Sequence, residues 1–181
     1  FGDKAKQHGI WLVAGTMPES SSTGRPFNTS VLFDPEGRRG GIYRKIHLFD
    51  VSLGAGATHH ESAHVEPGTT PVLAETPFGK IGMTICYDLR FPDLYRTYAR
   101  AGAEMLTVPA AFTVPTGRDH WEVLLRARAI ENQCFVLAAG QFGQNTPTRT
   151  TFGRSMIIDP WGTVLATAPD RPSVITAELD F

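Results

Sequence analysis

Residues 80–93 read KIGMTICYDLRFPD, an apolar run that leads directly into a helix start. The first part has the character of a buried strand, and Pro92 suits the first turn of a helix. Cys86 stands between the two. In α/β folds, side chains at the carboxyl ends of strands face the crevice outside the sheet, where unpaired helix N–H groups can hold an anion. The stretch therefore predicts a nucleophilic thiol, and the alternative is a small buried hydrophobe.

The composition is that of one globular domain spanning residues 1–181, with 41% hydrophobic and 19% charged residues. A net charge of −1 favours neither nucleic acid nor an anionic membrane as partner. Cys86 and Cys134 both lie in apolar runs, which indicates reduced thiols. The sequence shows no signal-peptide pattern and no apolar stretch near the length of a membrane span. We therefore expect a cytoplasmic protein without a membrane partner.

Strand and helix patterns alternate along the chain, which predicts an α/β fold with a mixed sheet, or a pair of sheets, covered by helices. A long polar stretch at 50–71, rich in Gly and Pro, is expected to be a functional loop. The expected strands are 10–15, 28–34, 41–47, 81–86, 105–109, 134–139, 155–159 and 163–168, and the expected helices are 92–101 and 119–132.

At each end of the chain, the sequence pattern of a helix or strand reaches the terminus without the signal that would normally begin or end it. Residues 3–9 have the basic residues and the glycine of a helix end, without a helix start. Residues 173–181 read as a strand with no terminator. We therefore expect a domain that is incomplete at the N-terminus and also at the C-terminus.

A cysteine nucleophile needs a base and a group that stabilises an oxyanion. Lys45 lies at the end of a hairpin strand and shares one face with Tyr43 and His47 by alternation, although a surface lysine on a strand edge is the commoner case. The candidate carboxylates, all between that strand and Cys86, are Glu61, Glu66 and Glu75, of which Glu75 is expected to face solvent.

His60 to His64 fit the H-E-x-x-H zinc pattern. That pattern binds zinc only on a helix, which places the two imidazoles one turn apart. The glycines at 54, 56 and 68 and Pro67 argue against a helix here, and no third ligand is evident. We therefore expect no metal site.

Four blocks of the sequence, in order, resemble the nitrilase (carbon–nitrogen hydrolase) superfamily. Within it, the Cys-Tyr-Asp-x-Arg-Phe sequence at Cys86 is similar to the Nit amidase branch of deaminated-glutathione amidases and ω-amidases, whereas nitrilases proper favour Cys-Trp-Glu. The blocks are YRKIHLFD at 43–50, GKIGMTICYDLRFP at 79–92, HWEVLLRARAIENQ at 120–133 and GRSMIIDPWG at 153–162.

The resemblance implies an α-β-β-α sandwich, a homodimer or higher homo-oligomer formed through helices, and a Glu-Lys-Cys site without metal or organic cofactor. Cys86 matches the nucleophile, Lys45 the lysine that stabilises the tetrahedral intermediate, and Glu61 the second glutamate of the site. The general-base glutamate of the family precedes the segment that matches Phe1 to Gly9, so this general base is not in this chain.

We expect acyl transfer through a thioester on Cys86, with Lys45 and the backbone N–H of Tyr87 holding the oxyanion. Phe112 and Thr113 are expected to line the pocket, and Arg90 to meet a substrate carboxylate. The alternatives are ordinary packing for the first two and a structural salt bridge for Arg90. Cys134 is expected to be a core residue.

The leading function hypothesis is hydrolysis of a small carboxylate-bearing linear amide to an acid and ammonia. A second hypothesis is another branch of the superfamily, an N-carbamoyl amide hydrolase or a nitrilase, which usually has different residues after the cysteine. A third is a catalytically silent homologue that acts in assembly or binding. The absent base favours this third hypothesis, whereas the presence of both Lys45 and Cys86 opposes it.

Overall fold

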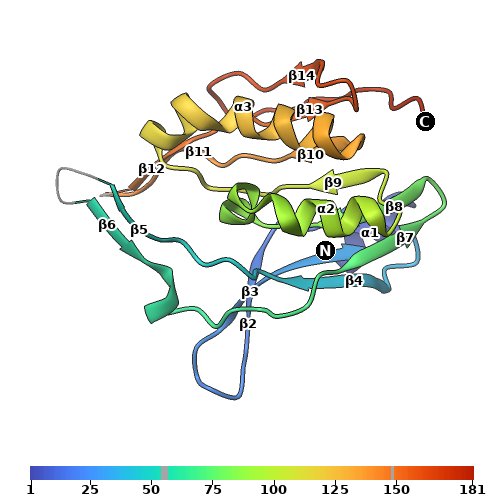
Figure 1. Ribbon diagram of the computed structural model, residues 1–181. Coiled ribbons are helices and arrows are strands. Elements are labelled where there is room, and N and C mark those ends of the chain that lie inside the picture. Colours follow the sequence, from blue (N-terminus) through green and yellow to red (C-terminus); the bar gives the residue numbers. More distant parts are fainter. Residues whose placement is uncertain (54–56, 148) are drawn as a thin grey trace. The chain divides into compact units, whose positions relative to one another are not determined.

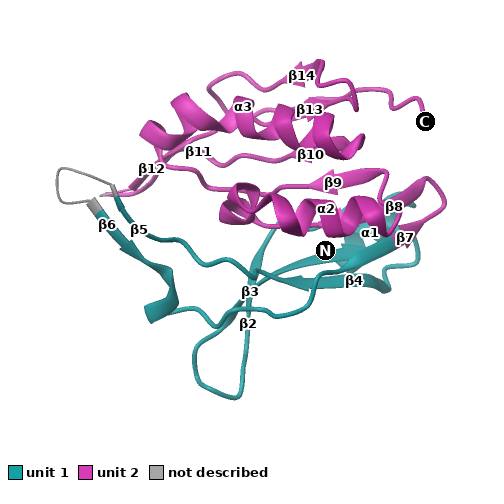
Figure 2. Ribbon diagram, viewed as in Figure 1, with its two compact units in different colours: residues 1–74 teal, residues 75–181 magenta. Residues whose placement is uncertain are grey.

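The computed structural model describes residues 1–53, 57–147 and 149–181, which form two compact units, Phe1–Ala74 and Glu75–Phe181 (Figure 2). No helix in the described part of the chain is both long and apolar enough to cross a membrane. The glycines at 54 and 56, which the sequence places in a loop, lie outside the described residues.

The first unit is built around the strand β3 (Phe27–Phe33), which pairs antiparallel with three others: β1 (Leu12–Val13), β2 (Met17–Glu19) and β4 (Arg39–Arg44). The β3–β4 hairpin turns on residues 34–38, where the Asp34 carboxylate accepts the backbone N–H groups of Glu36 and Arg38. Before this sheet comes helix α1 (Gly2–His8), which ends at Gly9 with φ 61°, as expected for a left-handed helix stop. The predicted hairpin is therefore confirmed.

The stretch at 50–71 is not one continuous loop, which corrects the prediction. It begins with an antiparallel hairpin of β5 (Asp50–Leu53) and β6 (Ala57–His60), followed by the 3-10 turn η1 (Glu61–Ala63). The sequence did not predict these strands because each is short and β6 carries consecutive polar residues, His59 and His60, so an alternation of polar and apolar residues is not evident.

The second unit contains a mixed sheet with the strand order β14-β13-β10-β9-β8-β7 (Figure 1). Strands β8 (Gly79–Met83), β9 (Met105–Thr107) and β10 (Phe135–Ala138) run parallel to one another. They are apolar because both faces of a parallel sheet are usually covered. The remaining strands are β7 (Leu73–Thr76), β13 (Met156–Ile158) and β14 (Val164–Thr167), and the last two form the predicted second hairpin.

Helices α2 (Pro92–Arg100) and α3 (Val114–Asn132) lie side by side on this sheet (Figure 1). Tyr95 and Tyr98 of α2 are fully buried, and the Tyr98 hydroxyl donates to the Met83 carbonyl at 2.6 Å. On α3, the buried Trp121 donates its indole N–H to the Arg154 carbonyl at 2.7 Å. These two helices fix the segment that follows β8, which contains Cys86.

Three local features of the second unit differ from the sequence prediction. Helix α3 begins at Val114 rather than Asp119, because Pro115 falls in its first turn, where a missing N–H costs little. The antiparallel pair β11 (Phe142–Thr146) and β12 (Arg149–Phe152) was not predicted. Residues 173–181 have no regular secondary structure, so the strand predicted there is wrong; in the described residues no strand pairs with them.

Candidate active site

Cys86 lies at the carboxyl end of β8, where the chain turns sharply. The Cys86 N–H donates to the Pro109 carbonyl at 2.9 Å. The chain after β8 thus stays hydrogen-bonded to the chain after β9, beyond Met83, where β8 ends. The 3-10 turn η2 (Cys86–Arg90) begins there. The buried Asp88 carboxylate accepts the Ile85 N–H at 2.8 Å, so a side chain inside the turn fixes the residue before Cys86. The predicted strand-to-helix junction is confirmed, with a 3-10 turn at its centre.

The backbone of Cys86 is strained. Its φ is 50°, in the left-handed region that non-glycine residues seldom adopt. Such a conformation costs about 1–3 kcal/mol and persists only where the surroundings over-determine it. The strain therefore marks the Cys86 turn as a place where position is maintained at the expense of stability.

The two cysteines are free thiols in different surroundings. Cys86 is partly exposed, whereas Cys134 is fully buried. The Cys134 thiol donates weakly to the carbonyls of Ala103 and Asn132 at 3.1 and 3.2 Å. Burial raises the pKa of Cys134 to about 11. Cys134 is therefore a core residue with a poorly reactive thiol, as expected.

Arg90, at the end of the η2 turn, lies between two aromatic rings. Its guanidinium carbon is 5.9 Å from the Tyr87 ring centroid and 5.8 Å from that of Phe112. One Arg90 nitrogen is 3.1 Å from Nδ1 of His120. An arginine can only donate, so a hydrogen bond between these two groups has Nδ1 of His120 as its acceptor. The structure thus places two predicted substrate-side residues, Tyr87 and Phe112, beside a third, the cationic Arg90.

The remaining substrate-side candidate, Thr113, lies at the start of α3. Its hydroxyl is 2.8 Å from that of Thr116, and it caps no backbone N–H of the helix. Phe112 is 7% exposed and packs on Trp121 with ring centroids 4.9 Å apart. The packing alternative for Phe112 therefore has direct support, and a role in lining a pocket stays a prediction.

Lys45 and Glu61 form an ion pair in the first unit. Lys45 follows β4 and is 2% exposed, so it is not a surface lysine. Its Nζ donates to Oε2 of Glu61, which also accepts the Phe49 N–H at 2.6 Å. Tyr43 and Lys45 are buried and Arg44 is exposed, as the predicted alternation requires, but β4 ends at Arg44 and the alternation does not extend to Ile46 and His47, which are both half-buried. The pair places a cation beside a carboxylate in a largely buried position.

The other carboxylate candidates have different surroundings. Glu66 accepts bonds from Arg25 at 2.8 Å and from the Thr23 hydroxyl at 2.9 Å. Glu75 is solvent-exposed, as predicted, and lies 3.9 Å from Lys80. Glu61 is therefore the one of these three carboxylates that contacts Lys45.

The two halves of the predicted site belong to different units: Lys45 and Glu61 to Phe1–Ala74, and Cys86 to Glu75–Phe181 (Figure 2). Each half is built by its own unit. The meeting of Lys45 with Cys86 stays a prediction.

The H-E-x-x-H segment does not form an α-helix. Residue 60 ends β6, Glu61–Ala63 form one 3-10 turn, and the described residues from 57 to 71 contain no α-helix. Glu61 bonds to Lys45 and Phe49. No group of three or more candidate metal ligands occurs among the residues that the structure describes.

Sequence reasoning did not identify Asp88, His120 or Arg128 as functional candidates. Asp88 holds the turn at Cys86, His120 contacts Arg90, and Arg128 contacts the turn from α3. The signal for Arg128 was available: it falls on the apolar face of its helix, beside Leu125 and Ala129. A charged residue on such a face needs a specific partner.

Comparison with known proteins supports the resemblance. The carbon-nitrogen hydrolase family pattern matches residues 1–181. The chain is 47% identical over 180 residues to a deaminated glutathione amidase of Synechocystis sp., covering 97% of this chain and 66% of that protein. The chain spans 66% of the length of this relative and 42% of the length of the Caenorhabditis elegans fusion protein NitFhit.

Solved structures agree on the fold. The crystal structure of the Caenorhabditis elegans NitFhit protein has a TM-score of 0.88 and 42% identity, covering 94% of this chain and 42% of that one. A variant of the amidase from Nesterenkonia sp. AN1, with the acetamide moiety of fluoroacetamide added covalently at its active site cysteine, has a TM-score of 0.79 and 27% identity. The match covers 95% of this chain and 62% of that one. The chain has the nitrilase-like α/β fold and belongs to the carbon-nitrogen hydrolase family.

Proposed function

We propose that this protein is an amidase that hydrolyses a small carboxylate-bearing linear amide to an acid and ammonia through a thioester on Cys86. The observation that carries the proposal is the strained Cys86 at the start of the η2 turn, in a chain 47% identical to a deaminated glutathione amidase. The covalent adduct at the active site cysteine of the Nesterenkonia amidase supports a covalent route.

In this mechanism the Cys86 sulfur, once its proton has passed to a carboxylate base, attacks the amide carbonyl. Lys45 and the Tyr87 N–H stabilise the tetrahedral oxyanion. The C–N bond then breaks, the nitrogen takes up a proton and ammonia leaves. Water attacks the thioester, releases the acid and returns a proton to the sulfur.

The base is assigned by resemblance to a glutamate preceding the segment that matches Phe1 to Gly9. Glu61 is the alternative within this sequence, because its carboxylate contacts Lys45. Arg90 offers a cation for the substrate carboxylate, since guanidinium and carboxylate form paired hydrogen bonds.

The test is ammonia release from glutaramate and succinamate, followed by acid quenching and mass spectrometry of the cysteine peptides. The proposal predicts turnover of these amides and an acyl adduct on the peptide containing Cys86. Preferred turnover of N-carbamoyl amino acids or nitriles would instead indicate another branch of the superfamily. No turnover of any of these compounds would support a catalytically silent homologue.

We also propose a cytoplasmic location and a homo-oligomeric state. The free thiols of Cys86 and Cys134 support a reducing compartment. Light scattering coupled to gel filtration tests the oligomer, and a single monomeric species would contradict it.

A further inference from the structure

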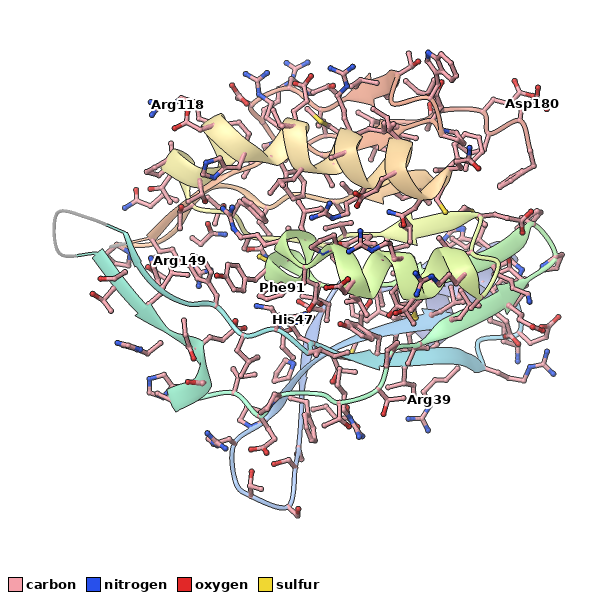
Figure 3. The ribbon with its side chains drawn as sticks, viewed as in Figure 1. Arg39, His47, Phe91, Arg118, Arg149 and Asp180 are labelled. Carbon is pink, nitrogen blue, oxygen red and sulfur yellow. The ribbon has the colours of Figure 1, made fainter. Side chains whose placement is uncertain are left out.

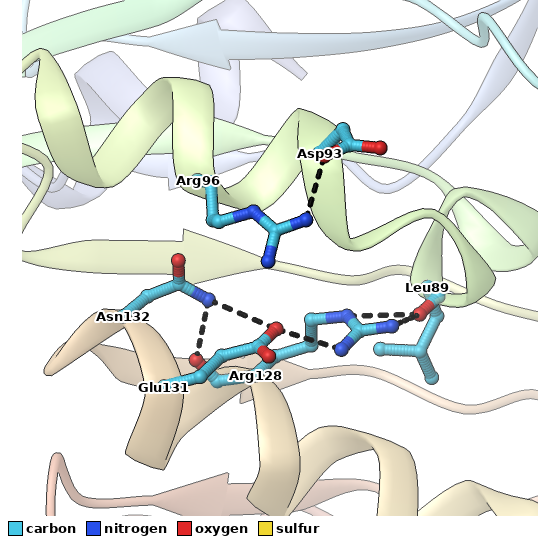
Figure 4. Close-up of polar contacts among 6 residues, drawn as sticks. All are labelled: Leu89, Asp93, Arg96, Arg128, Glu131 and Asn132. Atoms are coloured by element: carbon cyan, nitrogen blue, oxygen red, sulfur yellow. Dashed lines mark hydrogen bonds and ion pairs between the residues drawn. The ribbon is translucent and has the colours of Figure 1, made fainter.

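Arg128 is a buried arginine that binds the turn containing Cys86. It lies near the end of α3 and is 5% exposed. Its Nε and one terminal nitrogen both donate to the Leu89 carbonyl, at 3.0 and 2.8 Å (Figure 4). Leu89 belongs to η2, three residues after Cys86. The Arg128 guanidinium therefore binds a main-chain oxygen of the η2 turn through two hydrogen bonds.

Arg128 is held in this orientation by its own helix. Its other terminal nitrogen donates to Glu131 at 2.7 Å, and the Asn132 amide donates to the Arg128 carbonyl at 2.9 Å (Figure 4). Burying a guanidinium costs several kcal/mol unless it is paired and hydrogen-bonded. Glu131 supplies the opposite charge and Leu89 the remaining acceptor.

Arg118 of the same helix shows the ordinary alternative. It extends from α3 with a side chain that is 70% exposed and pairs with its neighbour Asp119 at 3.0 Å (Figure 3). Such exposed pairs contribute little, about 0–1 kcal/mol. The contrast indicates that the desolvation cost of burying the Arg128 guanidinium is offset by its hydrogen bonds to Leu89 and Glu131.

Arg128 is also linked, through Tyr95 of α2, to the chain before Cys86. Its guanidinium carbon lies 5.3 Å from the Tyr95 ring centroid. The Tyr95 hydroxyl is 2.8 Å from the hydroxyl of Thr84, which in turn donates to the Thr107 carbonyl at 2.7 Å. Thr84 lies two residues before Cys86. Arg128 is thus linked to both sides of a residue whose left-handed φ must be enforced from outside.

We propose that Arg128 is a positioning residue: by binding the Leu89 carbonyl it holds the η2 turn, and with it the Cys86 sulfur and the Tyr87 N–H, in the geometry that acyl transfer requires. The catalytic part of this inference rests on the proposed amidase function. Displacing a reacting group by about 1 Å can cost on the order of 10²-fold in rate.

The test compares Arg128→Lys with Arg118→Lys. Lysine retains the charge but cannot donate to Leu89 and Glu131 in the planar arrangement of arginine. Arg128→Lys should lower kcat by about 10–100-fold and change KM less than about threefold, while Arg118→Lys should match the wild type. Glu131→Gln, which keeps the Leu89 contact, should give a smaller loss and serves as a second variant if Arg128→Lys does not fold.

A second readout does not require turnover: the rate of Cys86 alkylation by iodoacetamide as a function of pH. Arg128→Lys should shift this profile relative to the wild type and Arg118→Lys, because the donors near the thiol move. Folded Arg128→Lys and Glu131→Gln proteins with wild-type kcat and wild-type alkylation profiles would overturn the inference. A wild-type protein without amidase activity would instead contradict the proposed function, while the alkylation profiles would still test Arg128.

Discussion

The Lys45–Glu61 pair and the Cys86 turn are built in different ways. In the first unit, a buried lysine is held by one carboxylate, so position depends on charge. In the second unit, Cys86 is held by main-chain bonds, a carboxylate on the Ile85 N–H and a guanidinium on the Leu89 carbonyl, so position depends on backbone geometry. Substitutions at the Lys45–Glu61 pair should therefore act by removing a charge, whereas substitutions around the Cys86 turn should act by displacing the Cys86 sulfur.

The largest expected effect comes from the thiols themselves. Cys86→Ala should abolish amide turnover, a loss of at least about 10³-fold, with an unchanged melting temperature, because it removes the nucleophile from a partly exposed position. Cys134→Ala should retain the wild-type kcat and lose about 1–2 kcal/mol of stability, because it leaves a small cavity in the core. Steady-state kinetics give the turnover of both variants, thermal melts the melting temperature and urea denaturation the free energy of unfolding. Turnover retained by Cys86→Ala would refute the nucleophile assignment.

The next prediction distinguishes the structural role of the Lys45–Glu61 ion pair from its catalytic role. Glu61→Gln should lower the free energy of unfolding by about 3 kcal/mol, because it leaves the buried Lys45 cation without its opposite charge. It should also lower kcat.

Adding Lys45→Met to Glu61→Gln sharpens this result. The double variant should regain much of the lost stability, because no buried charge remains, yet it should stay inactive if Lys45 holds the oxyanion. Denaturant melts and turnover are measured on the same preparations. A double variant that recovers activity along with stability would show that Lys45 has only a structural role.

The sequence predicted most of the second unit because its parallel strands are apolar along their length and its α2 helix has clear boundaries at Pro92 and Gly102. It failed at β5–β6 and β11–β12, whose strands are short and largely polar, so that any alternation of apolar residues is too brief to indicate a strand. Residues 173–181 show the opposite error, because an alternating pattern forms a strand only where a partner strand pairs with it.

For the candidate site, the sequence predicted Cys86 from its place at the end of a strand and Lys45 from its place at the end of a hairpin strand. It could not show that Lys45 is buried against Glu61, since that contact spans 16 residues through the β5–β6 hairpin. Arg128 was likewise missed, because its acceptor is a main-chain carbonyl 39 residues away, and a main-chain acceptor carries no sequence signature. Long-range contacts to the backbone are thus the part of the site that only the structure reveals.

A glycine pair tests how tightly each unit is packed. A Cβ on Gly82 of β8 would lie 2.7 Å from the Tyr98 ring, whereas a Cβ on Gly40 of β4 would meet Trp11 at 3.4 Å. Gly82→Ala should therefore cost about 1–3 kcal/mol by pushing α2 from the strand that leads to Cys86. Gly40→Ala should be close to neutral. Thermal melts give the comparison, and equal stability of the two variants would show that α2 moves aside at little cost.

The smallest expected effect is a pH dependence in the first unit. The Arg44 guanidinium donates to both oxygens of Glu19, at 2.6 and 2.8 Å, and holds the pKa of that carboxyl at about 2, below its usual 4.5. A carboxyl with a lowered pKa in the folded state adds stability above its unfolded value, and that stability disappears as pH falls toward the folded value. Glu19→Gln should therefore be less stable than the wild type above pH 4.5 and equally stable near pH 2.

The control for this pH dependence is Glu75→Gln, which removes a carboxylate that is 81% exposed and lies 3.9 Å from Lys80, too far for a close ion pair. Its melting temperature should follow that of the wild type at every pH, because an exposed, loosely paired carboxylate contributes little to stability. Melting temperatures of the three proteins from pH 2 to 7 make the test. If the difference between Glu19→Gln and the wild type did not change over that range, the Arg44 contact would have no electrostatic role in stability.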